Sequence, residues 1–533
     1  MANDAAQLKK DLNRFVIEGS LNTVFGTLIG GAFLVGFALA LGAEDSHIGM
    51  LAAMPPLLNL VQILGSYLVQ RVGSSKKVCL ITSALFRLAW LFIALMPMLV
   101  MGELQSATGI VVLILAIAVA SLFASLSGIA WMSWVTPLVP ETVRGRFFGF
   151  RNMIASLTGM LIALAAGRFI DFWQTTHSDP TAMISGYSLM FGVAVLFGFL
   201  GLLVLSRVSD VRAVPSPTGD SFLSQLRKPI QDSGFRRWII FAACWSFSVG
   251  VASPFFSVYM IRTLAIPFSL IATLGLVSGM FNTFGMRLWG SVIDEIGSKT
   301  LLLVCSIVGG GLPLLWLLAT PDNIGILWFI NVLTGLAWSG IGLSTSQLLM
   351  SAAPREGSSV YFAVFAAITG LSGAVAPLAG GSLVQLLPPM QLDTVTISSV
   401  QMIFVITASL RLLSLVLLQR VPAAKEMSIQ ETVVKLRELS NFQMLRGGQH
   451  LSTLSIHLEN TLSNVSAGAL HLEGRVERIV DRGIHLAKRA EAKSQKVDAQ
   501  LNKSLDAWEK VLDRIITPVA KTVRKLYDFL TKE

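Results

Sequence analysis

"GSVIDEIGSKT", residues 290–300, breaks a long apolar stretch with two carboxylates, a lysine and a glycine turn. The run "LIATLGLVSGMFNTFGMRLW" precedes it, and "LLLVCSIVGGGLPLLWLLA" follows it. Apolar runs of about 20 residues are long enough to cross a membrane as helices. We therefore expect a hairpin between two membrane helices, with Gly297 at the reversal because glycine tolerates positive φ.

The whole chain repeats this arrangement of apolar runs and short polar gaps. Its 533 residues are 53% hydrophobic and 14% charged, with a mean hydropathy of +0.68, whereas soluble domains carry about 25% charged residues. The shortage of charge is confined to residues 19–419, and residues 420–533 have an ordinary composition. This pattern predicts an all-α polytopic membrane protein with a polar C-terminal extension.

Twelve spans are predicted in two sets of six. The first set is 19–41, 46–69, 78–101, 108–137, 147–168 and 184–206, and the second is 237–261, 267–290, 299–319, 323–350, 358–385 and 397–419. The domains follow: an N-terminal six-helix bundle at 1–206, a polar linker at 207–236, a C-terminal six-helix bundle at 237–420 and an extension at 421–533.

The basic residues lie almost wholly in the gaps on one side of these spans. That side carries Lys and Arg near residues 9–14, 71–77, 144–146, 207–237, 299, 355 and 420–425, and the other side carries only Arg168 and Arg262. Loops rich in Lys and Arg stay in the cytoplasm. We therefore expect both termini and the linker to be cytoplasmic in a bacterial-type inner membrane. The net charge of +10 then reflects topology and not a nucleic-acid partner.

The two halves also repeat each other in sequence. "SYLVQRVGSSKK" (66–77) aligns with the opening segment, so that Gly73 matches Gly297. "PETVRGRFFGFRN" (140–152) aligns with "PREGSSVYFAVFA" (354–366), and in that register Gly167 matches Gly381. Internal repeats of this kind are common among transporters.

These two loops resemble signatures of the major facilitator superfamily. The superfamily loop is approximately G-x-L-A-D-R-x-G-R-K, and Gly290, Asp294, Gly297 and Lys299 keep it in the second half. The resemblance implies two pseudo-symmetric six-helix bundles, a central cavity lined mainly by spans 1, 4, 7 and 10, and alternating access. It also implies a cytoplasmic latch between the halves at Asp294, with a weaker first-half copy because Gln70 is uncharged. The other gating candidates are Arg71, Gly73, Arg144 and Arg146.

A Gly/Pro run, "SGAVAPLAGG" (372–381), has two interpretations. It resembles a run found in span 5 of drug–proton antiporters, although here it lies in span 11. It also suits close helix packing through small residues.

Polar and aromatic residues within the spans are the substrate-binding candidates. Intramembrane ionisable groups mark functional sites by default. The candidates are Asn22, Arg87, Trp131, Arg151, Asn152, Trp245, Asn331, Trp338 and Gln347. Glu18 and Asp171 are expected at span ends, so no acid is expected at mid-membrane. This set favours an amphipathic or largely apolar solute.

The extension carries stripes of apolar residues at helical spacing, the clearest from Val497 to Leu530, with Lys and Arg beside them. Three interpretations remain open. These amphipathic helices could form a small bundle, lie on the anionic membrane surface, or dock a partner protein or a second copy.

We therefore expect a secondary active or facilitative transporter for a small solute in a lipid membrane. The alternative is a transporter-like scaffold, assembly factor or complex subunit that docks partners through residues 421–533. No enzyme activity, cofactor or metal is predicted, because no span groups a nucleophile with a base or a set of metal ligands.

Overall fold

A computed structural model describes residues 2–62, 71–99, 107–139, 141–177, 179–210, 228–354, 358–392 and 395–422. The predicted amphipathic helices of the extension lie outside the described residues.

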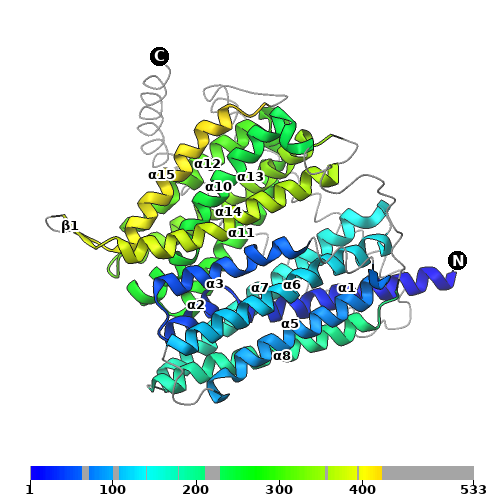
Figure 1. Cartoon of the computed structure of the whole chain (residues 1–533), viewed down its shortest axis with the longest axis horizontal. Coiled ribbons are helices and arrows are strands. Elements are labelled where there is room, and N and C mark those ends of the chain that lie inside the picture. Colours follow the sequence, from blue (N-terminus) through cyan, green and yellow to red (C-terminus); the bar gives the residue numbers. More distant parts are fainter. Residues whose placement is uncertain are drawn as a thin grey trace, which may run out of the picture. The chain divides into compact units, whose positions relative to one another are not determined.

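Long helices account for nearly all of the described chain (Figure 1). The first half contains α1 (Ala2–Ile29), α2 (Gly31–Ala40), α3 (Asp45–Leu58), the short η1 (Asn59–Val61), α5 (Ser75–Leu99), α6 (Ala107–Leu138), α7 (Glu141–Thr176) and α8 (Pro180–Ser206). The second half contains α10 (Ser233–Val258), the π-helix η2 (Tyr259–Thr263), α11 (Phe268–Ile296), α12 (Ser298–Leu315), η3 (Trp316–Leu318), α13 (Ile326–Ala352), α14 (Ser358–Leu386) and α15 (Ser399–Gln419).

A two-stranded antiparallel hairpin, β1 (Met390–Leu392) and β2 (Val395–Ile397), joins α14 to α15. The sequence analysis did not predict it, because three-residue strands are too short to show an alternating pattern. Figure 1 shows β1 at the opposite end of the helices from the N-terminus. We call the end with β1 and residue 45 the Asp45 end, and the end with the N-terminus and residue 294 the Asp294 end.

Eleven helices of the described residues are long and apolar enough to span a membrane. They match every predicted span except the second, which begins in α3 and continues at 63–70, outside the described residues. The helical segment that contains the first predicted span runs from Lys10 to Ala40. The helix α1 thus begins before residue 19 and includes the polar residues that precede the apolar run.

The two most extensive helix contacts between the halves are those of α3 with α14 and of α7 with α11. These are spans 2 and 11 and spans 5 and 8. Because the internal repeat relates span 2 to span 8 and span 5 to span 11, it maps each pair onto the other. Within the halves, α1 packs on α7 and α8, and α10 packs on α14 and α15. The two six-helix groups are thus related as the sequence repeat predicts.

The predicted glycine turns are confirmed in both halves. Gly297 has φ +84° and Gly73 has φ +69°, a region that L residues with side chains rarely adopt. Each turn reverses the chain between consecutive helices at the Asp294 end.

In each half, an arginine of the first helix also donates a hydrogen bond to a carbonyl just after the last helix. Arg14 in α1 donates to the carbonyl of Arg207 at 2.6 Å, and Arg237 in α10 donates to the carbonyl of Arg420 at 3.5 Å. This correspondence sets the register between the first and seventh spans.

Candidate functional site

A cavity of about 710 Å³ lies between the two halves. The first half contributes α1, α2, α3, α5 and α6 to its wall, and the second contributes α10 and α14. The polar lining residues are Asn59, Gln62, Ser121, Ser125, Ser253 and Ser257. None of the described residues that line it carries a formal charge, so the cavity suits a neutral solute.

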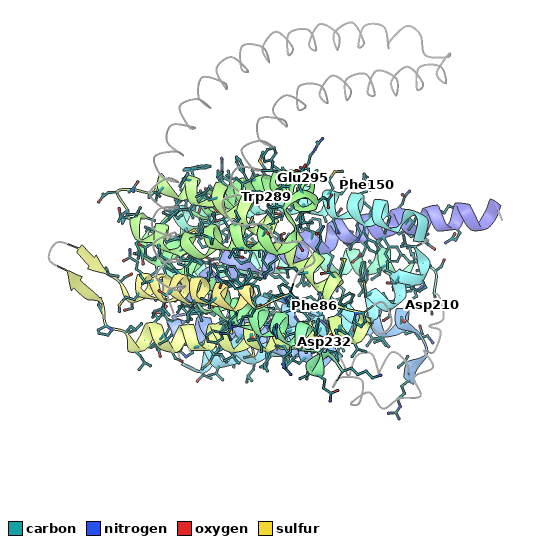
Figure 2. All side chains as sticks on the ribbon, turned by 90° about the horizontal axis from the view of Figure 1, so that it is seen from above. Phe86, Phe150, Asp210, Asp232, Trp289 and Glu295 are labelled. Atoms are coloured by element: carbon teal, nitrogen blue, oxygen red, sulfur yellow. The ribbon has the colours of Figure 1, made fainter. Side chains whose placement is uncertain are left out.

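One wall of this cavity is aromatic. Phe86 and Trp90 lie one helical turn apart on α5, and both line the cavity. Phe86 lies among the helices in Figure 2. Opposite residues include Pro254 and Pro377, which are also apolar. Large flat side chains bury much apolar area at small entropic cost, so this wall favours a flat apolar body.

Asn22 continues the cavity face of α1 toward the Asp294 end. It precedes Gly26 and Gly30 by four-residue steps, and residues at that spacing share one helix face. Gly26 and Gly30 line the cavity, and the Asn22 side chain is exposed. The predicted candidate Asn22 therefore lies one turn from the cavity.

Arg87 lies behind Asn22 and is buried, with 3% of its surface exposed. Its Nε donates to the Gly198 carbonyl at 2.6 Å, and one terminal nitrogen donates to the Ser83 carbonyl at 2.9 Å. The other donates to Oδ1 of Asn22 at 3.1 Å. Arg87 thus links α1, α5 and α8 and holds the Asn22 amide, and it does not line the cavity.

Glu18 of α1 is buried and faces Arg151 of α7. A guanidinium nitrogen of Arg151 lies 3.4 Å from Oε2 of Glu18, and Glu18 is 4% exposed. Arg151 also donates to the Phe15 carbonyl at 3.2 Å and lies over the Trp131 ring at 4.8 Å. Glu18 directly precedes the predicted span start at residue 19, within the helical segment that begins at Lys10.

The second half has aromatic rings where the first half has this ion pair. The register that pairs Arg14 with Arg237 sets Glu18 against Phe241, and the register of the loop repeat sets Arg151 against Phe365. Trp238 stacks on Phe365 at 6.0 Å and packs beside Phe241 at 5.6 Å. At these two positions, therefore, only the first half carries ionisable groups.

Three polar contacts join the halves at the Asp45 end. Arg262 of η2 pairs with Asp45 at 3.0 Å and donates to the Ala43 carbonyl at 3.2 Å. The π-helical turn, followed by Ala265 at φ +47°, presents Arg262 to α3. π-turns of this kind are frequent at functional sites.

The other two contacts are related by the repeat. Asp171 of α7 accepts the backbone N–H groups of Phe268 and Ser269 at 2.6 and 2.9 Å, at the start of α11. Gln385 of α14 donates to Glu44 and to the Ser46 hydroxyl, both at 2.9 Å, at the start of α3. We call the three contacts of Arg262, Asp171 and Gln385 the Asp45-end clasp.

Glycines allow the backbones to touch beside this clasp. A Cβ at Gly381 would lie 2.8 Å from the Asp45 carbonyl oxygen, and one at Gly167 would lie 2.7 Å from that of Phe268. A Cβ at Gly49 would collide with the Pro377 carbonyl. Gly167 and Gly381 are the pair matched by the sequence repeat. The run 372–381 thus provides close helix contacts, as its packing interpretation predicts.

The family model described as Major Facilitator Superfamily matches residues 19–377, and it matches 239–467 a second time. The chain belongs to the major facilitator superfamily. The superfamily fold accounts for the two six-helix groups and the cavity between them.

Solved structures of the superfamily fold are similar to this chain at low sequence identity. A variant of the nucleoside transporter NupG has 12% identity and a TM-score of 0.61, and the match covers 77% of this chain and 99% of that one. The D-xylose-proton symporter has 16% identity and a TM-score of 0.58, covering 79% and 100%. An inward-facing bacterial homologue of ferroportin has 13% identity and a TM-score of 0.56, covering 78% and 98%. None of the curated proteins matches the sequence.

The superfamily motif residues lie at the Asp294 end. Gly290 and Asp294 lie near the end of α11, and Lys299, in the first turn of α12, donates to the Gln419 carbonyl of its own half at 3.1 Å. Arg71 is exposed, whereas Gln70 and the side chains of Arg144 and Arg146 lie outside the described part of the chain. The latch role of this motif stays a prediction.

The remaining substrate candidates lie away from the cavity wall. Asn331, Trp338 and Gln347 are on α13, and the Asn331 amide donates to the Leu327 carbonyl of its own helix at 2.8 Å. Trp245 is 7% exposed, and Asn152 is exposed on α7. Of the four spans expected to line the cavity, spans 1, 4 and 7 contribute described lining residues, as do α3 and α14, whereas no residue of α13 is among them.

Sequence reasoning did not single out the Asp45-end clasp. A signal was present, because Arg168 and Arg262 are the only basic residues predicted on that side. An isolated arginine beside acidic span ends indicates an ion pair, but the sequence does not show which acid it meets.

Proposed function

We propose that the protein is a secondary transporter that moves a small, neutral, amphipathic or largely apolar solute by alternating access. The uncharged cavity formed by both halves carries this proposal. A solute between two bundles that rock against each other is exposed to one side of the membrane at a time. Ligand sites of this kind are mostly apolar with a few polar groups.

The Asp45-end clasp supports an assignment of the conformational state, that is, of the side of the membrane to which the cavity opens. If the basic gaps are cytoplasmic, the Asp45 end faces outward, and its polar contacts and glycine contacts close the outer side. The cavity would then communicate with the cytoplasm. A single cysteine introduced in the 207–236 linker should react only with reagents that reach the cytoplasm, and labelling from outside would refute this orientation.

The first prediction concerns the cavity volume. Gly26 lines the cavity, and an added Cβ there meets no atom within 4 Å. Gly26→Phe should therefore fold and fill the cavity. We expect the amount of the small molecule that co-purifies with the protein to fall at least about tenfold. The phenyl ring of the new side chain would occupy the volume that this molecule needs. Mass spectrometry of solvent extracts measures this, and flux of that molecule into proteoliposomes should fall equally.

Gly192→Phe is the matched control. Gly192 lies on α8, also has no atom within 4 Å of an added Cβ, and does not line the cavity. It should leave both measurements unchanged. Equal amounts of bound molecule in wild type and Gly26→Phe would exclude this cavity as the solute site.

A scaffold or complex subunit is the second candidate. The degenerate first motif, with Gln70 in the acidic position, and the long extension favour it. The absence of a predicted mid-membrane acid favours it as well. Purification in mild detergent separates the two. Stoichiometric membrane proteins in the particle would support the subunit, and a lone chain with a bound small molecule would support the transporter.

A further inference from the structure

We propose that the cavity selects solutes that accept hydrogen bonds, because Asn59 in its wall and Asn22 one helical turn beyond it present N–H groups and bond their own oxygens to donors within the protein. This inference rests on the proposed function and adds the chemical class of the solute. The class is a neutral compound with a carbonyl or ether oxygen on a flat apolar body.

The orientation of Asn22 follows from the chemistry of its partner. An arginine has five N–H donors and no acceptor. The Asn22 atom 3.1 Å from Arg87 must therefore be Oδ1, and the Nδ2 group with its two N–H donors is left to the exposed side. Gly26, one helical turn further along the same face of α1, lines the cavity.

Arg87 also fixes and strengthens this donor. Its bonds to the Gly198 and Ser83 carbonyls hold the guanidinium between α5 and α8, so it cannot turn away from Asn22. Hydrogen bonds to charged groups are stronger than neutral ones, and bonded groups polarise each other in a low dielectric. The N–H groups of Asn22 are consequently better donors than those of a free amide. Arg87 is a positioning residue.

Asn59, in the cavity wall, also has its side-chain oxygen bonded to donors of the protein. Its Oδ1 accepts the Ser125 hydroxyl at 2.8 Å and Nε2 of Gln62 at 3.4 Å. The Nδ2 group of Asn59 is then the part of the amide that remains for a solute. Gln62, the other amide in the cavity wall, leaves one amide oxygen. When Asn22 is counted with Asn59 and Gln62, donors exceed acceptors among the three amides, and serine hydroxyls act in either role.

The rest of the lining excludes other solute classes. No described lining residue is a carboxylate that would bind an amine, and none is a cation that would bind an acid. Phe86 and Trp90 supply a flat apolar wall. A neutral ketone, ester, lactone or aromatic ether satisfies both the donors and this wall.

The test uses three probes that share one naphthalene skeleton. These are methyl β-naphthyl ketone, the corresponding secondary alcohol and β-ethylnaphthalene, which has no polar atom. Binding to the full chain in lipid nanodiscs is measured by equilibrium dialysis, and nanodiscs with Gly26→Phe give the lipid background. We expect the ketone to bind about tenfold more tightly than the hydrocarbon and more tightly than the alcohol.

Asn22→Asp is the decisive variant. It keeps the size of the side chain and accepts from Arg87, but it has no N–H. The ketone-to-hydrocarbon preference should fall to within about twofold of equality. Ser125→Ala is a second variant that leaves Arg87 and Asn22 intact. It frees the Asn59 amide to turn, so the ketone-to-alcohol preference should fall about threefold.

Each outcome bears on the proposal. Equal binding of the three probes to wild type, a preference for the alcohol, or an unchanged preference in both variants would overturn the acceptor inference and leave the cavity as a solute site. No binding of any probe above the Gly26→Phe background would overturn both the inference and the proposed function.

Discussion

Gly49→Leu should hold the Asp45 end open and abolish transport. In the structure, α3 and α14 approach so closely that a Cβ at Gly49 would collide with the Pro377 carbonyl, and the two backbones meet again at Gly381. A leucine cannot be accommodated by rotating a flexible neighbour, because the obstacle is backbone. Overpacking of a tight contact costs about 1–3 kcal/mol or more. Each 1.4 kcal/mol shifts a two-state equilibrium about tenfold, so the closed state should lose its majority.

A cysteine probe in the cavity measures this shift. Ser257 lines the cavity from α10, and Ser257→Cys can be placed in a Cys244→Ala background, because Cys244 is the exposed cysteine of the described chain. We expect labelling by an impermeant thiol reagent from the Asp45 side to rise at least about tenfold with Gly49→Leu.

Gly192→Leu serves as the control for helix glycines, since it faces open space on α8. It should change neither the labelling rate nor the flux. If Gly49→Leu labels at the wild-type rate and transports normally, the close contact of α3 with α14 is not part of the conformational cycle.

Arg151→Ala should be the most destabilising single substitution in the first half. It leaves Glu18 buried without its cation, and it removes the stacking over Trp131. Breaking a buried pair by removing one partner costs about 3–5 kcal/mol, because the remaining charge stays desolvated. Reversible unfolding by SDS in mixed micelles, followed by tryptophan fluorescence, measures the free energy of unfolding.

The double variant separates charge from packing. Glu18→Gln together with Arg151→Ala should recover most of the lost stability, because the buried carboxylate charge is then removed together with its paired cation. Arg168→Ala on the same helix is exposed and should cost no more than about 0.5 kcal/mol. An Arg151→Ala variant as stable as Arg168→Ala would mean that Glu18 is solvated or protonated in the membrane.

Sequence patterns predicted the helical architecture because membrane helices can be identified from the length and hydropathy of their apolar runs. The two halves and the glycine turns at Gly73 and Gly297 followed from local sequence and were confirmed. The hairpin β1–β2 was missed because it is short and lies in a gap. The apolar pattern did not show that α1 extends through Glu18 and its polar neighbours, where Glu18 pairs with Arg151 of α7.

The site was harder to predict because it depends on contacts between distant segments. Asn22 was a candidate from its place in the first span, but its orientation depends on Arg87, which is 65 residues away. Asn331 and Trp338 were candidates by analogy with the superfamily, but no residue of α13 is among the described residues that line this cavity. No local sequence pattern indicates which helix faces a cavity.

The wide turn η2 makes the Asp45-end clasp sensitive to chain length as well as to side-chain chemistry. The N–H of Leu264 bonds the carbonyl of Tyr259, five residues back, so the turn holds one residue more than an α-helical turn. A homologue shorter by one residue here could close the same helix as α. Each residue of an α-helix turns the chain by about 100°, and Arg262 would then be rotated away from Asp45. A single-residue deletion would thus undo the contact while leaving both charged residues in the sequence.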